Sequence, residues 1–183
     1  MKTTLNLLIA IVLLSSSAMA QKFITKNGNI SFFSSTPMEN IEAHNKQVNA
    51  ALDVETGDFV FKVLIKSFKF EKALMQEHFN ENYLESDKFP NATFTGKISN
   101  YADIDFSKEG IYNAQLEGKL TIHGVTQDIE EMGTFTVSKD GITGKSKFNV
   151  KVADYNINIP KTVINNIAES IEVTVDVDLK PLK

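Results

Sequence analysis

The chain has 183 residues, a formal net charge of −4 and no cysteine, and its 19 basic residues are all lysines. This length fits one domain with a real core, and that core must hold without disulfides. The acidic balance and the lack of arginine exclude nucleic acid as an expected partner and argue against a dedicated pyrophosphate clamp.

The N-terminal stretch predicts a secretory signal peptide over residues 1–20. Lys2 gives a positive start, an apolar run follows, and Ala18-Met19-Ala20 forms a small-x-small cleavage site before Gln21. The apolar run is too short to cross a bilayer comfortably, which argues against a membrane anchor. We therefore expect a periplasmic or secreted domain over residues 21–183 without a transmembrane segment.

The first part of the mature chain predicts short strands. Residues 22–34 predict two strands around Asn27-Gly28, a strong hairpin signal. Residues 41–45 fit either a helical turn or a bent strand. Apolar alternation over 48–54 and 59–66 then predicts another strand pair.

Between residues 71 and 84 the apolar positions recur at helical spacing. Leu74, Met75, His78, Phe79 and Tyr83 predict an amphipathic helix of a few turns. A Phe-Pro turn follows, and residues 92–98 return to the alternation of a strand.

A central hairpin is predicted in the stretch LEGKLTIHGVTQDI, residues 116–129. Leu116, Leu120 and Ile122 alternate with polar residues, and Gly124 permits a sharp reversal. Its strands cover about 111–122 and 125–137. Another strand ends near residue 152, an irregular segment covers 153–166, and a last strand covers 171–179.

About eight antiparallel strands and one short helix define an all-β fold, either a sandwich or a barrel. Each regular strand has one apolar face, so these faces must be enclosed together. A closed barrel of about eight strands does this without leaving edges, and it is just wide enough to hold one small ligand.

The sequence predicts no catalytic residue, metal site or cofactor. His44, His78 and His123 lack metal-ligand spacing, and no nucleophile or phosphate-loop motif occurs. We expect His78 in the core or at a rim, and His123 in a local hydrogen bond. Glu130 and Glu131 point to opposite faces of a strand, so one of them is expected inward or at a rim.

Large apolar side chains on the strands and the helix are the candidate ligand-binding residues. They could fill a solid core or line a cavity, and the pattern alone favours the solid core, since sequence period does not separate the two. The candidate lining consists of Phe32, Phe59, Phe61, Leu74, Phe79, Phe94, Leu120, Phe135 and Phe148.

Three stretches resemble the YceI-like family of exported, polyisoprenoid-binding barrels: LTIHGVT (120–126), EHFNENYLESDKFPNATF (77–94) and the final IEVTVDVDL. The resemblance implies a lipocalin-like antiparallel barrel around a polyisoprenoid, an isoprenoid quinone or a similar amphiphilic lipid, and it favours the cavity over the solid core. The chain departs from the family in its first strands and before the helix, where the family's usual histidine-serine and arginine-aspartate pairs are missing.

Non-catalytic binding, carriage or sequestration of such a lipid is therefore the expected function. The alternative is a periplasmic stress-response or protein-interaction module with a merely structural barrel. An isomerase or cyclase would need a buried acid–base pair, which the sequence does not reveal. The sequence does not determine the oligomeric state, and a homodimer is one possibility alongside a monomer.

Overall fold

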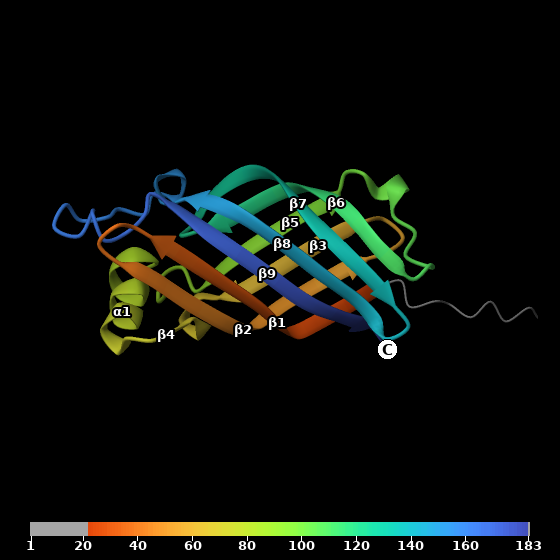
Figure 1. Ribbon diagram of the computed structural model, residues 1–183, viewed down its shortest axis with the longest axis horizontal. Helices are drawn as coiled ribbons and strands as arrows, with labels where there is room; N and C mark the ends of the chain where they lie inside the picture. Colours follow the sequence, from red (N-terminus) through yellow and green to blue (C-terminus); the bar gives the residue numbers. More distant parts are fainter. Residues whose placement is uncertain (1–21, 183) are drawn as a thin grey trace, which may run out of the picture.

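The computed structural model describes residues 22–182 as a single β-barrel with helical turns at its ends (Figure 1). The predicted signal peptide lies outside the described residues. The strands are β1 (Lys22–Ser35), β2 (Asn40–Asp53), β3 (Asp58–Leu64), β4 (Lys69–Phe70), β5 (Asn91–Ile98), β6 (Gly110–Ile122), β7 (Val125–Ser138), β8 (Gly141–Lys151) and β9 (Ser170–Pro181). The helical elements are the α-helix α1 (Ala73–His78), the π-helical turn η2 (Phe79–Tyr83) and the 3₁₀ turns η1 (Ile65–Ser67), η3 (Tyr101–Asp103) and η4 (Val152–Tyr155).

The sheet closes on itself. Its strand order is β1-β9-β8-β7-β6-β5-β3-β2, and the pairing of β1 with β2 completes the circle, while the two-residue β4 is added beside β2. Every pairing is antiparallel. The predicted antiparallel barrel of about eight strands with one short helix is therefore confirmed.

The central hairpin forms as predicted. Its register runs from Gly110 opposite Val137 to Ile122 opposite Val125. The two loop residues, His123 and Gly124, both have positive φ, of 52° and 75°. A two-residue loop with this geometry matches the twist of the strands that it joins.

The predicted hairpin at Asn27-Gly28 is wrong, because β1 continues through it as one strand. The register against β2 shifts on both sides of Gly28, which marks a β-bulge. A Cβ at Gly28 would lie 2.6 Å from Cγ1 of Val177 and 3.3 Å from Cβ of Val48. The glycine thus permits close packing inside the barrel and does not form a turn.

The structure resolves the conformation of residues 41–45 and corrects the length of the predicted helix. Residues 41–45 are strand and belong to β2. The predicted helix is confirmed but is shorter, because α1 ends at His78 and passes directly into the π-helical turn η2.

The two ends of the barrel differ. In Figure 1, α1 and the segment between η4 and β9 lie at the left end, and the C-terminus lies at the right end. The most completely buried apolar side chains, including Leu52, Ile142 and Leu179, form a continuous core together with Phe135. The end near the C-terminus is therefore filled by apolar side chains. At the opposite end lie α1 and the segment between η4 and β9 (Figure 1).

Candidate functional site

The barrel encloses an apolar cavity of about 360 Å³. Side chains from most strands, from α1 and η2, and from the segment 157–167 line it. The volume is more than twice that of the ~150 Å³ cavity that takes up benzene, and it falls within the ~300–1,000 Å³ range of small-molecule sites. The barrel is therefore hollow at one end and filled at the other.

Most of the predicted lining residues face this cavity. They are Phe32, Phe59, Phe61, Phe79, Phe94, Leu120, Phe135 and Phe148. Leu74 does not, since it is 61% exposed and lies outside the lining. Neighbouring helical residues point about 100° apart, and α1 turns Met75 and His78, with Phe79 at the start of η2, toward the cavity instead.

Aromatic rings close the filled end and form the floor of the cavity. The Phe59 and Phe135 ring centroids lie 5.6 Å apart in an edge-to-face arrangement. Phe106 packs on Phe135 at 5.8 Å, and Tyr101 packs on Phe106 at 6.3 Å. Such contacts add stability beyond the area that they bury, so they stabilise the closed end of the barrel.

Four phenylalanines form a second aromatic cluster beside α1. Phe79 lies between 5.0 and 5.5 Å from Phe32, Phe68 and Phe70, measured between ring centroids. Phe68 and Phe70 also line the cavity, although the sequence analysis did not select them. They follow the 3₁₀ turn η1, where the alternation of the preceding strand is lost.

Phe94 stands in the cavity wall because the neighbouring strands leave room for its ring. Gly96 and Gly118 face each other across β5 and β6. A Cβ at Gly96 would lie 2.6 Å from Cζ of Phe94. The paired glycines therefore accommodate the ring against the backbone.

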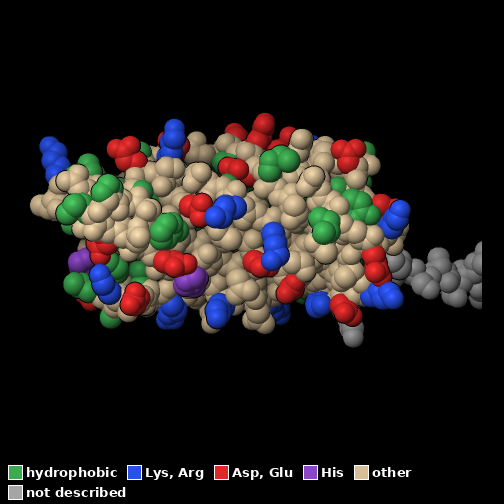
Figure 2. Space-filling view, in the orientation of Figure 1, with side chains coloured by type: hydrophobic (Ala, Val, Ile, Leu, Met, Phe, Trp, Pro, Cys, Tyr) green, Lys and Arg blue, Asp and Glu red, His purple; other side chains and the backbone are tan. Residues whose placement is uncertain are grey.

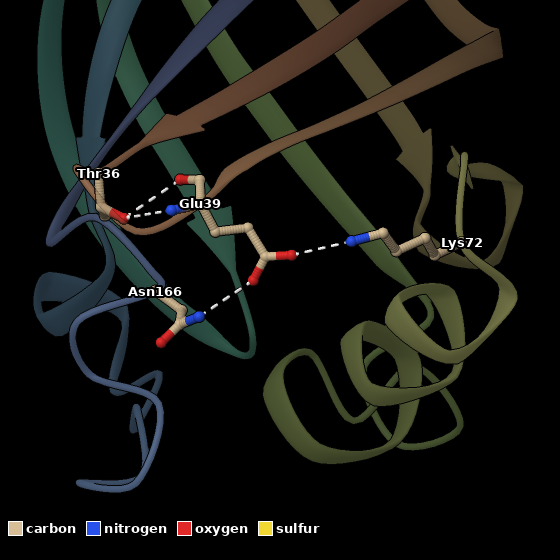
Figure 3. A network of polar contacts seen from close by, with 4 residues as sticks. All are labelled: Thr36, Glu39, Lys72 and Asn166. Atoms are coloured by element: carbon tan, nitrogen blue, oxygen red, sulfur yellow. Dashed lines mark hydrogen bonds and ion pairs between the residues drawn. The ribbon is translucent and has the colours of Figure 1, made fainter.

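A network of polar contacts spans the mouth of the cavity (Figure 3). Glu39 accepts a hydrogen bond from Lys72 Nζ at 3.1 Å and one from Asn166 Nδ2 at 3.2 Å. Thr36 fixes the turn that carries Glu39, because its hydroxyl accepts from the Glu39 amide at 3.1 Å. The bond from Lys72, with that from Asn166, lowers the pKa of the Glu39 carboxyl below its ordinary value of 4.5.

The irregular segment before β9 completes the lining. Ile157, Ile159, Val163 and Ile167 all face the cavity. The amide of Ala168 donates to the Ser34 hydroxyl at 2.9 Å, which ties the segment to the end of β1. These residues were missed, although the recurrence of large apolar side chains in a segment without regular period was a usable signal.

Two predictions about charged residues have outcomes here. Glu131 takes an inward-facing, half-buried position and Glu130 is exposed, as the alternation required. The prediction for His123 is wrong, because its partners are distant in the chain. Its Nε2 lies 2.7 Å from Glu85 Oε2, and its Nδ1 lies 3.2 Å from the Tyr155 carbonyl oxygen.

The outer face of the barrel is charged and solvated. Figure 2 shows acidic and basic side chains interspersed over the visible face. Pairs such as Lys145–Asp176 at 2.9 Å and Lys147–Glu172 at 2.7 Å join neighbouring strands. Within residues 22–182, no group of three or more histidine or acidic side chains could hold a metal ion. No helix in the same range is long and apolar enough to cross a membrane.

A closed antiparallel barrel with a blind aromatic floor and an apolar cavity is the architecture of a β-barrel that binds small hydrophobic molecules. The family model of the YceI-like domain matches residues 21–179. The chain therefore belongs to the YceI-like family. A comparison with curated proteins found no match.

Three solved structures share the fold. A polyisoprenoid-binding domain from Saccharophagus degradans, implicated in plant cell wall breakdown, has a TM-score of 0.76 at 14% identity, with coverage of 90% of this chain and 99% of that one. BcnA from Burkholderia cenocepacia has a TM-score of 0.67 at 17% identity, over 83% and 94% of the two chains. The YCEI protein of Campylobacter jejuni has a TM-score of 0.61 at 19% identity, over 77% and 85%.

Proposed function

We propose that the protein binds a polyisoprenoid, an isoprenoid quinone or a similar amphiphilic lipid and carries or sequesters it without chemical change. The observation that carries the proposal is the one-ended apolar cavity, whose lining is rich in phenylalanine. Membership of the YceI-like family and the fold shared with a polyisoprenoid-binding domain support it.

The energetics suit an apolar tail. Each methylene that leaves water for the cavity gains roughly 0.8 kcal/mol. Association costs about 4–15 kcal/mol in lost freedom, so a short tail binds weakly and a longer one gains affinity as it fills the cavity. Recognition of this kind requires shape and apolar surface, and both are present without any directional contact.

A chain-length series tests the proposal. Geraniol, farnesol and geranylgeraniol share a head group and differ only in tail length. We expect affinity, measured by competition with a fluorescent isoprenoid analogue, to rise with length and to level off once the cavity is full. Equal, weak binding of all three would contradict the proposal and favour the alternative, a periplasmic stress-response or protein-interaction module.

A second measurement identifies the natural ligand. The protein is purified from its exported form without added lipid, extracted with organic solvent and analysed by mass spectrometry. We expect an isoprenoid lipid in stoichiometric amount. Export through the signal peptide at residues 1–20 is part of the proposal, because such a carrier would serve the periplasm or the exterior.

A further inference from the structure

The barrel wall opens between β7 and β8. The two strands pair only from Ser138 opposite Gly141 to Gly133 opposite Ser146. Beyond this point, residues 125–132 continue to pair with β6, and residues 147–151 continue to pair with β9. The two strands therefore diverge while each stays in the sheet, and a lateral opening lies between them.

A second hollow of about 220 Å³ occupies this lateral opening. Side chains from β6, β7, β8 and η4 line it. It shares Leu120, Ile129, Phe148 and Val150 with the apolar cavity, so the two spaces have a common wall. The opening therefore adjoins the cavity in which the tail of a ligand would lie.

Two polar side chains, those of Glu131 and Tyr155, line this opening. Tyr155 is only 3% exposed, and Glu131 is half buried on the inward face of β7. Both residues line the hollow, and neither the tyrosine hydroxyl nor the Glu131 carboxylate forms a hydrogen bond or ion pair with another residue of the described range 22–182. Neither is a fully buried atom without a partner, so both groups are accessible from the hollow. Burial raises the pKa of Glu131. Burial, and then the charges of Asp154 and Glu131, raise the pKa of the Tyr155 hydroxyl.

Fully buried polar side chains are normally hydrogen-bonded within the protein, and among residues 22–182 the buried side-chain atom without a partner is Asn80 Oδ1, not an atom of Glu131 or Tyr155. Two fully buried side chains show the usual pattern. Asn45, which is 1% exposed, donates to the Leu64 carbonyl at 2.9 Å. Ser34, equally buried, accepts from the Ala168 amide. Glu131 and Tyr155 therefore have hydrogen-bonding capacity that the protein itself does not use.

The opening is also held in shape. The Asp154 carbonyl accepts a hydrogen bond from Gln127 Nε2 at 2.7 Å. The next carbonyl, that of Tyr155, lies 3.2 Å from His123 Nδ1. These contacts fasten η4, and with it Tyr155, to the central hairpin. Pre-organised groups bind a ligand with a smaller entropy loss.

We propose that this lateral opening holds the head group of the lipid whose tail fills the cavity, and that the head group is a hydrogen-bond donor without negative charge, such as an alcohol or an amine. This inference rests on the proposed function. The Glu131 carboxylate accepts from such a donor, and the Tyr155 hydroxyl can donate or accept.

The charge around the opening discriminates against phosphate. Glu131, Asp128 and Asp154 line it together with a single basic residue, Lys151. Asp128 also forms a 2.8 Å ion pair with Lys119 on the outer face. A phosphorylated head group would place its negative charge beside these carboxylates. Within the described part of the chain, no arginine and no pair of lysines lines the opening to form ion pairs with the phosphate.

Four probes of equal tail length test the inference: geranylgeraniol, geranylgeranylamine, geranylgeranyl monophosphate and the hydrocarbon phytane. In the parent protein we expect the alcohol and the amine to bind roughly three- to tenfold more tightly than the monophosphate, as one or two hydrogen bonds allow. Phytane reports the contribution of the tail alone.

Three variants complete the test. Glu131→Gln should weaken the amine and strengthen the monophosphate, and Tyr155→Phe should weaken the alcohol about threefold. Glu130→Gln is the matched control, because Glu130 is the exposed neighbour on the same strand. It should leave the affinities for the amine, the alcohol and the monophosphate unchanged. Phytane should bind all four proteins alike, which also verifies that the variants are folded.

The outcomes separate the two proposals. If phytane binds while the parent and the variants treat alcohol, amine and monophosphate alike, the head-group site is refuted and the lipid-binding proposal stands. A parent protein that prefers the monophosphate also refutes it. If no probe binds the parent protein, the proposed function fails, and the inference fails with it.

Discussion

Replacing Phe94 by alanine should separate ligand binding from folding. Phe94 is half buried in β5, lies opposite Phe61 and Leu120, and lines the cavity. If about a third of the ~200 Å² surface of an aromatic side chain faces the ligand, its loss at ~25 cal/mol per Å² weakens binding by about 1.7 kcal/mol, or roughly fifteenfold. The empty protein should lose about 2–3 kcal/mol of unfolding free energy, since the ring is incompletely packed.

Phe106 offers the matched control. It is also half buried, packs on Phe135 and Tyr101 below the floor, and lies outside the cavity lining. Phe106→Ala should cost a similar unfolding free energy and leave affinity unchanged. The assay pairs urea unfolding of the empty proteins with titration of a fluorescent isoprenoid analogue. Equal loss of affinity in both variants would mean that Phe94 acts through stability alone, and the reasoning about the wall would be wrong.

Three further predictions concern the hairpin, the mouth and the N-terminus. Gly124→Val should destabilise the fold by about 1–3 kcal/mol in thermal unfolding, because φ is +75° and a Cβ would lie 2.5 Å from Phe89 Cε1; unchanged melting would mean that the loop relaxes freely. The lowered pKa of Glu39 means that its carboxylate stabilises the folded mouth above pH 4.5 and that this contribution is lost as pH falls through the lowered pKa. The protection factors for hydrogen exchange in residues 157–167, corrected for the intrinsic pH dependence of exchange, should therefore fall in acid, and Glu39→Gln should abolish that fall. Intact-mass analysis of exported protein should give a chain that begins at Gln21, and retention of residues 1–20 would contradict the signal peptide.

Strand alternation was a sufficient basis for most of the barrel. Where one face is buried and the other solvated, period two fixes both the strand and its register, as in the central hairpin and in β9. The same alternation placed Phe61, Phe94 and Phe148 on inward faces. It misjudged β1, because an Asn-Gly pair has the same sequence in a hairpin loop and in a bulge. The continued pairing of β1 with β2 on both sides of Gly28, together with the packing of Gly28 against Val177, identifies the bulge.

The mouth and the lateral opening could not be predicted in the same way. Asn166 and Glu39 are 127 residues apart, and no local period links them. Tyr155 stands in a 3₁₀ turn whose position depends on contacts with His123 and Gln127. Where backbone pairing ends, side-chain contacts between distant segments decide the structure, and these leave no periodic signal in the sequence.

The aromatic floor has a consequence for transport. Because the floor closes one end, a lipid cannot pass along the barrel axis from one end to the other, as it would in an end-to-end conduit between two membranes. If the protein carries lipid as proposed, it would act as a shuttle, which loads one guest, diffuses with it and unloads it. The flux of such a shuttle should scale with the number of protein molecules and saturate when each is occupied, whereas flux through a conduit would depend on the number of continuous bridges.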